Sequence, residues 1–244
     1  MGADADDKTP IPDDARPRHR AHGRLTAMRA ERFHRLRAVL VRRQPDLTVL
    51  MDRVNKSHNF SAILRNCDAV GVLEANVVPP EKGLDVHHGT SAGSKKWVAV
   101  RRHPDISTAI TYLKERDFVV MAAHVSDEST DYREIDYTVP TAIVLGAELH
   151  GVSDESLGLA DLNVSIPLAG MVHSLNVSVA SALILFEARR QREAAGMYDH
   201  SRLSETDFDR RLFEWTYPRL ASARRGSERP YPTLSADGEI IRES

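Results

Sequence analysis

Short runs rich in valine, isoleucine and leucine alternate with helical apolar patterns along most of this chain, and this alternation limits its fold more than any other feature. Strand runs separated by helical patterns build parallel strands joined by crossover helices, so the sequence predicts an α/β domain with a mostly parallel sheet. Some runs are apolar at every position, as in strands covered by helices on both faces. The strand-like runs and helical patterns, in their order along the chain, are LTVLMDRV, SAILRNCDAVGV, EANVV, WVAV, DISTAITYLKE, FVVMAAHV, TAIVLGAE and LNVSIPL.

The segment from residue 176 to 191, NVSVASALILFEARRQ, is apolar on nearly every side of a helix before it turns basic. A helix of this kind is buried on more sides than a surface helix, either in the core or in a subunit interface. One more helix is expected over residues 207–217. The chain carries enough apolar material for one main domain with a small appendage.

Arginines are concentrated between residues 16 and 43, where Glu31 is the only acidic residue. Apolar residues from Met28 to Leu40 recur at roughly helical spacing and Pro45 ends the pattern, which predicts a basic helix over residues 25–46. Such a helix would attract phosphate groups, although a solvated basic helix with no partner has the same pattern. Residues 1–24 have almost no apolar periodicity and are expected to form a disordered leader.

Several function classes are excluded by what the sequence lacks. No apolar run approaches the length of a membrane span, and the first residues are acidic and polar, unlike a signal peptide. Cys67 is the single cysteine, and no cysteine and histidine cluster has zinc-ligand spacing. We therefore expect a cytoplasmic protein that lacks membrane spans, disulfides and metal.

The first segment that carries chemistry follows the first expected strand and opens a helix, over residues 55–71. Ile63, Cys67 and Val70 recur at helical spacing and would face the sheet, so Arg65 must point away from the core. Asn59 lies at the strand-to-helix junction, where open α/β sheets bind ligands. Taken alone, Arg65 could be a solvated surface arginine and Asn59 an ordinary helix cap.

The second segment, residues 141–155, is an apolar strand that runs into a turn with Gly146 and Gly151. These glycines allow the backbone to approach a ligand closely, and Ser153 is a candidate cap for a following helix. The spacing lacks the Lys-Ser/Thr ending of a phosphate-binding P-loop. Glu148, inside the turn, is either a functional group or a plain turn carboxylate.

In the third segment, residues 164–180, a short strand gives way to a loop with Pro167 and Gly170. The apolar helix follows, with Ser174 or Asn176 as its cap. Each of the three segments, considered separately, has a satisfactory structural explanation.

Together, in order and spacing, the three segments resemble the three motifs of the SPOUT class of RNA methyltransferases, and within it the TrmH family of tRNA ribose 2'-O-methyltransferases. The resemblance runs from about Arg35 to Glu239 and includes the stretches RRQPDLTV, REIDYT, SLNVSVASALIL and AAGMY. It implies S-adenosylmethionine-dependent 2'-O-methylation of the guanosine at D-loop position 18 of tRNA. The implied fold is a SPOUT α/β knot over residues 47–196, with a deep C-terminal trefoil knot and basic N-terminal and C-terminal helical extensions, the latter over residues 197–244. The implied assembly is a homodimer with both sites at the interface.

The resemblance also assigns roles to residues. A guanidinium is a poor base at neutral pH, so the plain roles of Arg65 are to fix a phosphate and to stabilise a developing alkoxide, and the proton acceptor stays open. Many family members have a small hydroxyl residue where Ala123 stands, so one hydrogen bond to the cofactor would be missing. The catalytic residues implied are Arg65, Asn59, Glu148 and Asn176. The residues implied to hold S-adenosylmethionine, mostly through their backbone, are Ala123, Leu145, Gly146, Gly151, Ile166, Met171, Ser174 and Leu175. The residues implied to bind RNA are Arg35, Arg42, Arg43 and Arg65.

Two alternatives stand beside this interpretation. One is a sister enzyme that methylates a ribose in ribosomal RNA with the same core. Such relatives commonly carry an N-terminal RNA-binding domain of another kind, whereas a single helix is expected here. The other is a catalytically silent RNA-binding or nucleotide-sensing protein, against which the joint presence of the four implied catalytic residues argues.

Overall fold

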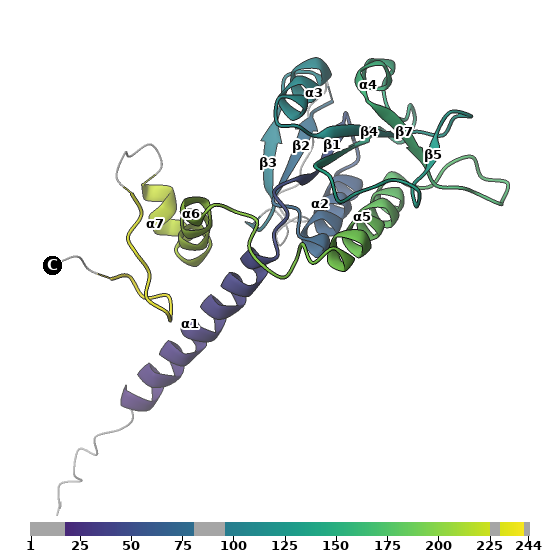
Figure 1. Cartoon of the computed structure of the whole chain (residues 1–244). Coiled ribbons are helices and arrows are strands. Elements are labelled where there is room, and N and C mark those ends of the chain that lie inside the picture. Colours follow the sequence, from purple (N-terminus) through teal and green to yellow (C-terminus); the bar gives the residue numbers. More distant parts are fainter. Residues whose placement is uncertain (1–17, 81–95, 225–229, 242–244) are drawn as a thin grey trace, which may run out of the picture.

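The computed structural model of the chain describes residues 18–80, 96–224 and 230–241, with side chains from residue 29 onward. Seven strands form one sheet in which every strand pair is parallel, so the expected α/β architecture is confirmed (Figure 1). The spatial order is β3-β2-β1-β6-β4-β7-β5. The strands are β1 (Leu47–Asp52), β2 (Glu74–Val78), β3 (Ala99–Arg102), β4 (Val119–Ala123), β5 (Thr130–Asp131), β6 (Thr141–Leu145) and β7 (Leu162–Ser165).

Helices cover both faces of this sheet (Figure 1). On one face α2 (Ser57–Val70) packs against α5 (Val177–Ala194), and on the other α3 (Ile106–Lys114) lies beside α4 (Asp154–Leu159). Both layers bury apolar side chains from the strands, which explains why the central strands β1 and β6 are buried at every position.

Helix α2 buries the face that its sequence predicts. Ile63, Cys67 and Val70 lie in the core between α2 and the sheet, and the helix ends at Gly71 in the left-handed conformation, which glycine adopts at little cost. Burial raises the pKa of the Cys67 thiol to about 12, above all through desolvation. Cys67 is therefore a neutral core side chain, and it has neither a disulfide partner nor a reactive thiolate.

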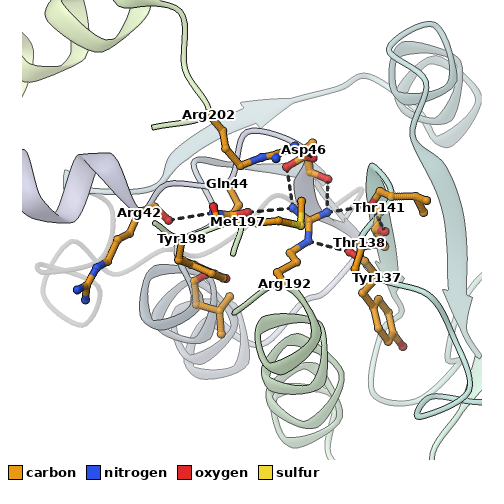
Figure 2. Close-up of polar contacts among 12 residues, drawn as sticks. Arg42, Gln44, Asp46, Tyr137, Thr138, Thr141, Arg192, Met197, Tyr198 and Arg202 are labelled. Carbon is orange, nitrogen blue, oxygen red and sulfur yellow. Dashed lines mark hydrogen bonds and ion pairs between the residues drawn. The ribbon is translucent and has the colours of Figure 1, made fainter. Parts of the chain in front are cut away.

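A buried guanidinium fixes the C-terminal end of α5 (Figure 2). Arg192 is fully buried and donates hydrogen bonds to the carbonyl oxygens of Tyr137, Val139 and Asp46, at 2.8, 2.8 and 3.0 Å. It also pairs with a carboxylate oxygen of Asp46, whose other oxygen pairs with Arg202. These contacts join α5 to the chain just before β1 and β6, at the amino-terminal edge of the sheet.

A helical group lies beside the sheet domain and consists of α1 (Arg18–Val41), α6 (Glu205–Thr216) and α7 (Pro218–Ala223) (Figure 1). Phe33, Leu36 and Leu40 of α1 pack against Leu212 and Trp215 of α6. The helices α6 and α7 lie in the segment expected to form the C-terminal extension.

The start of α1 corrects one expected boundary. The helix begins at Arg18, so residues 18–24 are helical and do not belong to a disordered leader. The physical reason is that no proline occurs between Arg18 and the end of the helix, and arginine and alanine are good helix formers even where no apolar stripe marks them. The rest of the expected leader, residues 1–17, lies outside the described residues.

Over the ranges that the structure describes, no helix is long and apolar enough to cross a membrane. The same ranges contain no group of three histidine, cysteine or acidic side chains that could hold a metal ion. The trefoil knot stays a prediction.

Candidate active site

The strand order brings the three chemistry-bearing segments together at one edge of the sheet. Strand β6 lies between β1 and β4, and β7 lies next to β4. Because all of these strands are parallel, their carboxyl ends lie side by side, and the segments that follow β1, β6 and β7 meet there.

Three of the four implied catalytic residues are in direct contact at this edge. The Nδ2 of Asn59 donates to Oε1 of Glu148 at 2.5 Å, across 89 residues of sequence. The Nδ2 of Asn176 donates to Oδ1 of Asn59 at 3.3 Å, across 117 residues. A continuous polar chain therefore joins the three segments, with Asn59 in the middle.

The structure shows which of the two asparagines caps a helix. Asn59 is buried inside α2, whose cap is Lys56, so its side chain serves Glu148 and Asn176 and does not cap the helix. Asn176 is the cap of α5: its Oδ1 accepts from the N–H of Ser178 while its Nδ2 reaches Asn59. Asn176 therefore both begins the helix and belongs to the site.

Glu148 leaves one oxygen available. Its Oε2 is buried and has no hydrogen-bond partner among the described residues. A buried carboxylate oxygen is a strong acceptor that is costly to leave unpaired. The arrangement is suited to accept a hydrogen bond from a bound substrate or from a guanidinium.

Arg65 follows Asn59 on the same helix, α2, and points outward, as the spacing predicts. Its side chain is exposed and makes no hydrogen bond or ion pair within the described part of the chain. The next residue, Asn66, fixes α2 to α5 through Ser178 O at 2.8 Å and Ser181 Oγ at 2.9 Å. Sequence reasoning missed Asn66, because nothing local indicates that an asparagine in a helix contacts a segment more than a hundred residues away.

The turn between β6 and α4 is closed tightly on itself. The N–H of Gly151 donates to the carbonyl of Ala147 at 2.8 Å, and Gly151 has φ +67°. A Cβ on Gly146 would lie 2.0–2.1 Å from main-chain atoms of Gly151 and Val152. Gly146 is therefore required by the turn itself, whereas the space beside Gly151 is open.

The residues implied to hold the cofactor come from neighbouring strand ends. Ala123 ends β4, Leu145 ends β6 and Ile166 directly follows β7. Within the described ranges, the main chain of residues 167–175 makes no hydrogen bond. No described residue therefore occupies its C=O groups or, Pro167 apart, its N–H groups, which include those of the implied Met171, Ser174 and Leu175 and are suited to bind a ligand.

The arginines expected to bind RNA do not all lie on the surface. Arg35 and Arg42 are exposed on or just after α1, but Arg43 is only 1% exposed. Its guanidinium pairs with Asp68, donates to the carbonyl of Val72 at 2.9 Å and lies over the Trp215 ring. The expectation for Arg43 is therefore wrong, because this side chain joins α1, α2 and α6 and has no surface to offer to a phosphate.

The chain matches known proteins along most of its length. Residues 46–186 match the SpoU rRNA Methylase family, and residues 190–243 match the C-terminal region of SpoU rRNA methylases. A tRNA (guanosine(18)-2'-O)-methyltransferase of Thermus thermophilus is 55% identical over 75% of this chain and 95% of that protein. The enzyme of the same name from Escherichia coli is 49% identical over 87% of this chain and 94% of that protein.

Solved structures agree with these matches. The crystal structure of the A. aeolicus TrmH/SpoU tRNA modifying enzyme superposes with a TM-score of 0.74 at 45% identity, over 79% of this chain and 98% of that one. The SpoU methyltransferase AviRb of Streptomyces viridochromogenes, crystallised with the cofactor AdoMet, superposes with a TM-score of 0.56 at 30% identity, over 62% of each chain. From the site that its three segments build and from these similarities, we conclude that the chain belongs to the SpoU rRNA methylase family.

Proposed function

We propose that this protein transfers a methyl group from S-adenosylmethionine to the 2'-hydroxyl of the guanosine at D-loop position 18 of tRNA. The observation that carries the proposal is the contact of Asn59 with Glu148 and Asn176, which joins three separated segments. The exposed Arg65 lies on the same helix as Asn59. Relatives that are 55% and 49% identical are named for this reaction. A silent RNA-binding protein would have no need for a buried, half-partnered carboxylate at this edge.

The residues present fit S-adenosylmethionine. The tight turn at Gly146 and Gly151 and the unpaired main chain of residues 167–175 offer the backbone donors and acceptors that recognise an adenosine and an amino-acid group. Ile166, which is only partly buried against the core, supplies apolar surface beside these groups. When bound, the cofactor supplies an electrophilic methyl group on a sulfonium.

The side chains of the site then align the acceptor ribose. Arg65 has the fork of donors that binds a phosphate, and its permanent charge stabilises the oxyanion that develops on the ribose. Asn59 holds Oε1 of Glu148 and so orients the carboxylate, and its Oε2, unpartnered among the described residues, is the proposed acceptor for a hydrogen bond from the substrate. This positioning lowers the entropic part of the barrier for an in-line displacement.

The exposed arginines of α1, including Arg35 and Arg42, are the proposed contacts to the folded tRNA, together with Arg65. Contacts to phosphates position RNA without reading its sequence, and salt weakens them strongly. A tRNA substrate in turn supports a cytoplasmic location.

The proposed assembly is a homodimer that uses the outer face of α5. Val179, Leu183 and Phe186 are large apolar side chains exposed on this helix. A shallow cavity of about 350 Å³ lies along the same face, between Tyr132 and Arg190. An apolar stripe of this kind on the surface of a folded chain is typical of a protein interface.

A labelling experiment tests the proposed function. Purified protein, labelled S-adenosylmethionine and an unmodified tRNA transcript should yield one methyl group per tRNA, and mass mapping should place it on the ribose of guanosine 18. A transcript with 2'-deoxyguanosine at that position should accept none. Methylation of a ribosomal RNA fragment in place of tRNA would favour the rRNA alternative. The similarity behind that alternative is lower: a solved rRNA methyltransferase from Sinorhizobium meliloti is 30% identical to this chain.

A further inference from the structure

A carboxylate outside the three segments lies against the turn that carries Glu148. Asp52, the last residue of β1, has a side chain that is 1% exposed. Its Oδ2 accepts two hydrogen bonds from the segment after the turn, from the N–H of Ser153 at 2.9 Å and from the hydroxyl of Ser156 at 2.8 Å. Its Oδ1 pairs with Arg53 Nη1 at 3.0 Å. Every oxygen of this buried charge is thus occupied by an identified donor.

These bonds fix the point where α4 begins. Ser153 caps α4 through its Oγ, which accepts from the N–H of Ser156 at 3.2 Å. Asp52 holds both residues of this cap from the neighbouring strand. The turn from Gly146 to Gly151 therefore lies between two fixed points: the end of β6 in the sheet and Ser153 on Asp52.

The residue after Asp52 strengthens the same attachment at some cost to the backbone. Arg53 has φ +53°, a conformation that L-residues other than glycine rarely adopt and that costs on the order of 1 kcal/mol. This bend lets its guanidinium reach Oδ1 of Asp52 and Oε2 of Glu155, the latter at 3.6 Å. Strained backbone of this kind is concentrated at functional sites.

The tip of the turn is held from the other side. Asn59 fixes Glu148, and the Ala147–Gly151 hydrogen bond closes the loop. If the Asp52 attachment is lost, the end of the turn at Ser153 loses its polar contact with β1, and we expect Gly146 and Gly151 to shift relative to the ends of β4 and β7. The backbone groups proposed to hold the cofactor lie on these elements.

We propose that Asp52 is a positioning residue for this site: it holds the turn from Gly146 to Gly151 in the geometry that binds S-adenosylmethionine and orients Glu148. This inference rests on the proposed function. Asp52 acts through Ser153 and Ser156 and touches neither the cofactor nor the RNA.

The test is the affinity for S-adenosylmethionine, measured by calorimetry on the full chain well below the unfolding temperature. Asp52→Ala should weaken binding about tenfold or more, as displaced positioning groups commonly do. In tRNA methylation it should raise the KM for S-adenosylmethionine more than the KM for tRNA. Asp52→Asn, which keeps an acceptor for Ser153, should lie between the parent and Asp52→Ala.

Asp161 provides the matched control. It also accepts a main-chain N–H, from Val120 at 2.8 Å, and pairs with Lys114 at 2.7 Å, but it lies at the amino-terminal edge of the sheet. Asp161→Ala should lower the unfolding temperature and leave the affinity for S-adenosylmethionine within twofold of the parent. A purely structural role for Asp52 would give the same result for Asp52→Ala, and that outcome would overturn the proposal.

Ser156→Ala keeps the proposal testable if Asp52→Ala does not fold, because it removes one donor to Oδ2 and leaves the charge paired with Arg53. It should weaken cofactor binding by about twofold to fivefold, and a parent-like affinity would overturn the proposal.

A parent protein that binds S-adenosylmethionine but methylates no tRNA would refute the proposed function alone. A parent that does not bind the cofactor would refute both.

Discussion

At the scale of single residues, the site depends on side chains that serve two partners at once. Asn59 donates to Glu148 and accepts from Asn176, and Asn176 also caps α5. Removing either asparagine would leave a buried polar atom without its partner, which costs more than the hydrogen bond itself. Arg65 differs from them, because it is exposed and unpaired within the described residues and is therefore free to act on a substrate.

Arg65→Ala should reduce methyl transfer to tRNA by about a hundredfold or more, the loss expected when one donor to a developing oxyanion is removed. The unfolding temperature should stay within about one degree of the parent, because surface positions contribute little to stability. Single-turnover rates at saturating S-adenosylmethionine measure the effect.

Arg116→Ala is the control for this experiment. Arg116 is also exposed, but it lies just after α3, where its guanidinium stacks on Tyr112. It should retain the parent rate. A parent-like rate for Arg65→Ala would remove Arg65 from the site.

At the scale of elements, α1 shows that charge in the sequence is not the same as charge on the surface. Arg42 and Arg43 are neighbours in the same arginine-rich segment, yet Arg42 is exposed and Arg43 is buried against Trp215. The packing of α1 on α6 decides this difference, because it encloses the end of the helix.

This pair of neighbours gives a direct test. Arg42→Ala should weaken tRNA binding and lower the slope of log affinity against log salt by about one. Arg43→Ala should leave that slope unchanged. It should reduce the free energy of unfolding by about 2–3 kcal/mol. This loss is smaller than for a fully buried ion pair because the Asp68 side chain is 33% exposed.

Filter binding at several salt concentrations, with urea denaturation of each variant, separates the two effects. A lower salt slope for Arg43→Ala would contradict the structural role of this arginine. An unchanged slope for Arg42→Ala would remove Arg42 from the RNA surface.

At the scale of the whole molecule, α5 both organises the site and leaves an apolar surface. Its buried face packs on α2 and the sheet, its first residues follow Asn176, and Arg192 fixes its far end (Figure 2). The exposed side carries Val179, Leu183 and Phe186. The apolar sequence of this helix thus has two explanations at once, a core and a proposed subunit interface.

Leu183→Glu should convert the proposed dimer into a monomer in sedimentation experiments, because a charge in an apolar interface is strongly unfavourable. Activity should fall with dimer content if both sites form at the interface. Leu159→Glu is the matched control: Leu159 is 37% exposed against 38% for Leu183, but it lies on α4, on the opposite face of the sheet. If the Leu183 variant remains a dimer, or if the parent is a monomer, the interface is elsewhere or absent.

The sequence by itself determined the fold class, the outward direction of Arg65 and the positions of the three segments. These features follow from local periodicity, from capping and turn residues, and from a resemblance in motif order. Each depends on residues that are neighbours along the chain.

Only the tertiary structure decided which distant groups meet. The insertion of β6 between β1 and β4 places Glu148 beside Asn59 and the Ser153 cap beside Asp52. The packing of α1 on α6 buries Arg43, and the contact of α5 with α2 gives Asn66 its role. The physical reason is that these contacts arise from strand order and from the packing of whole faces, which no local pattern of residues encodes.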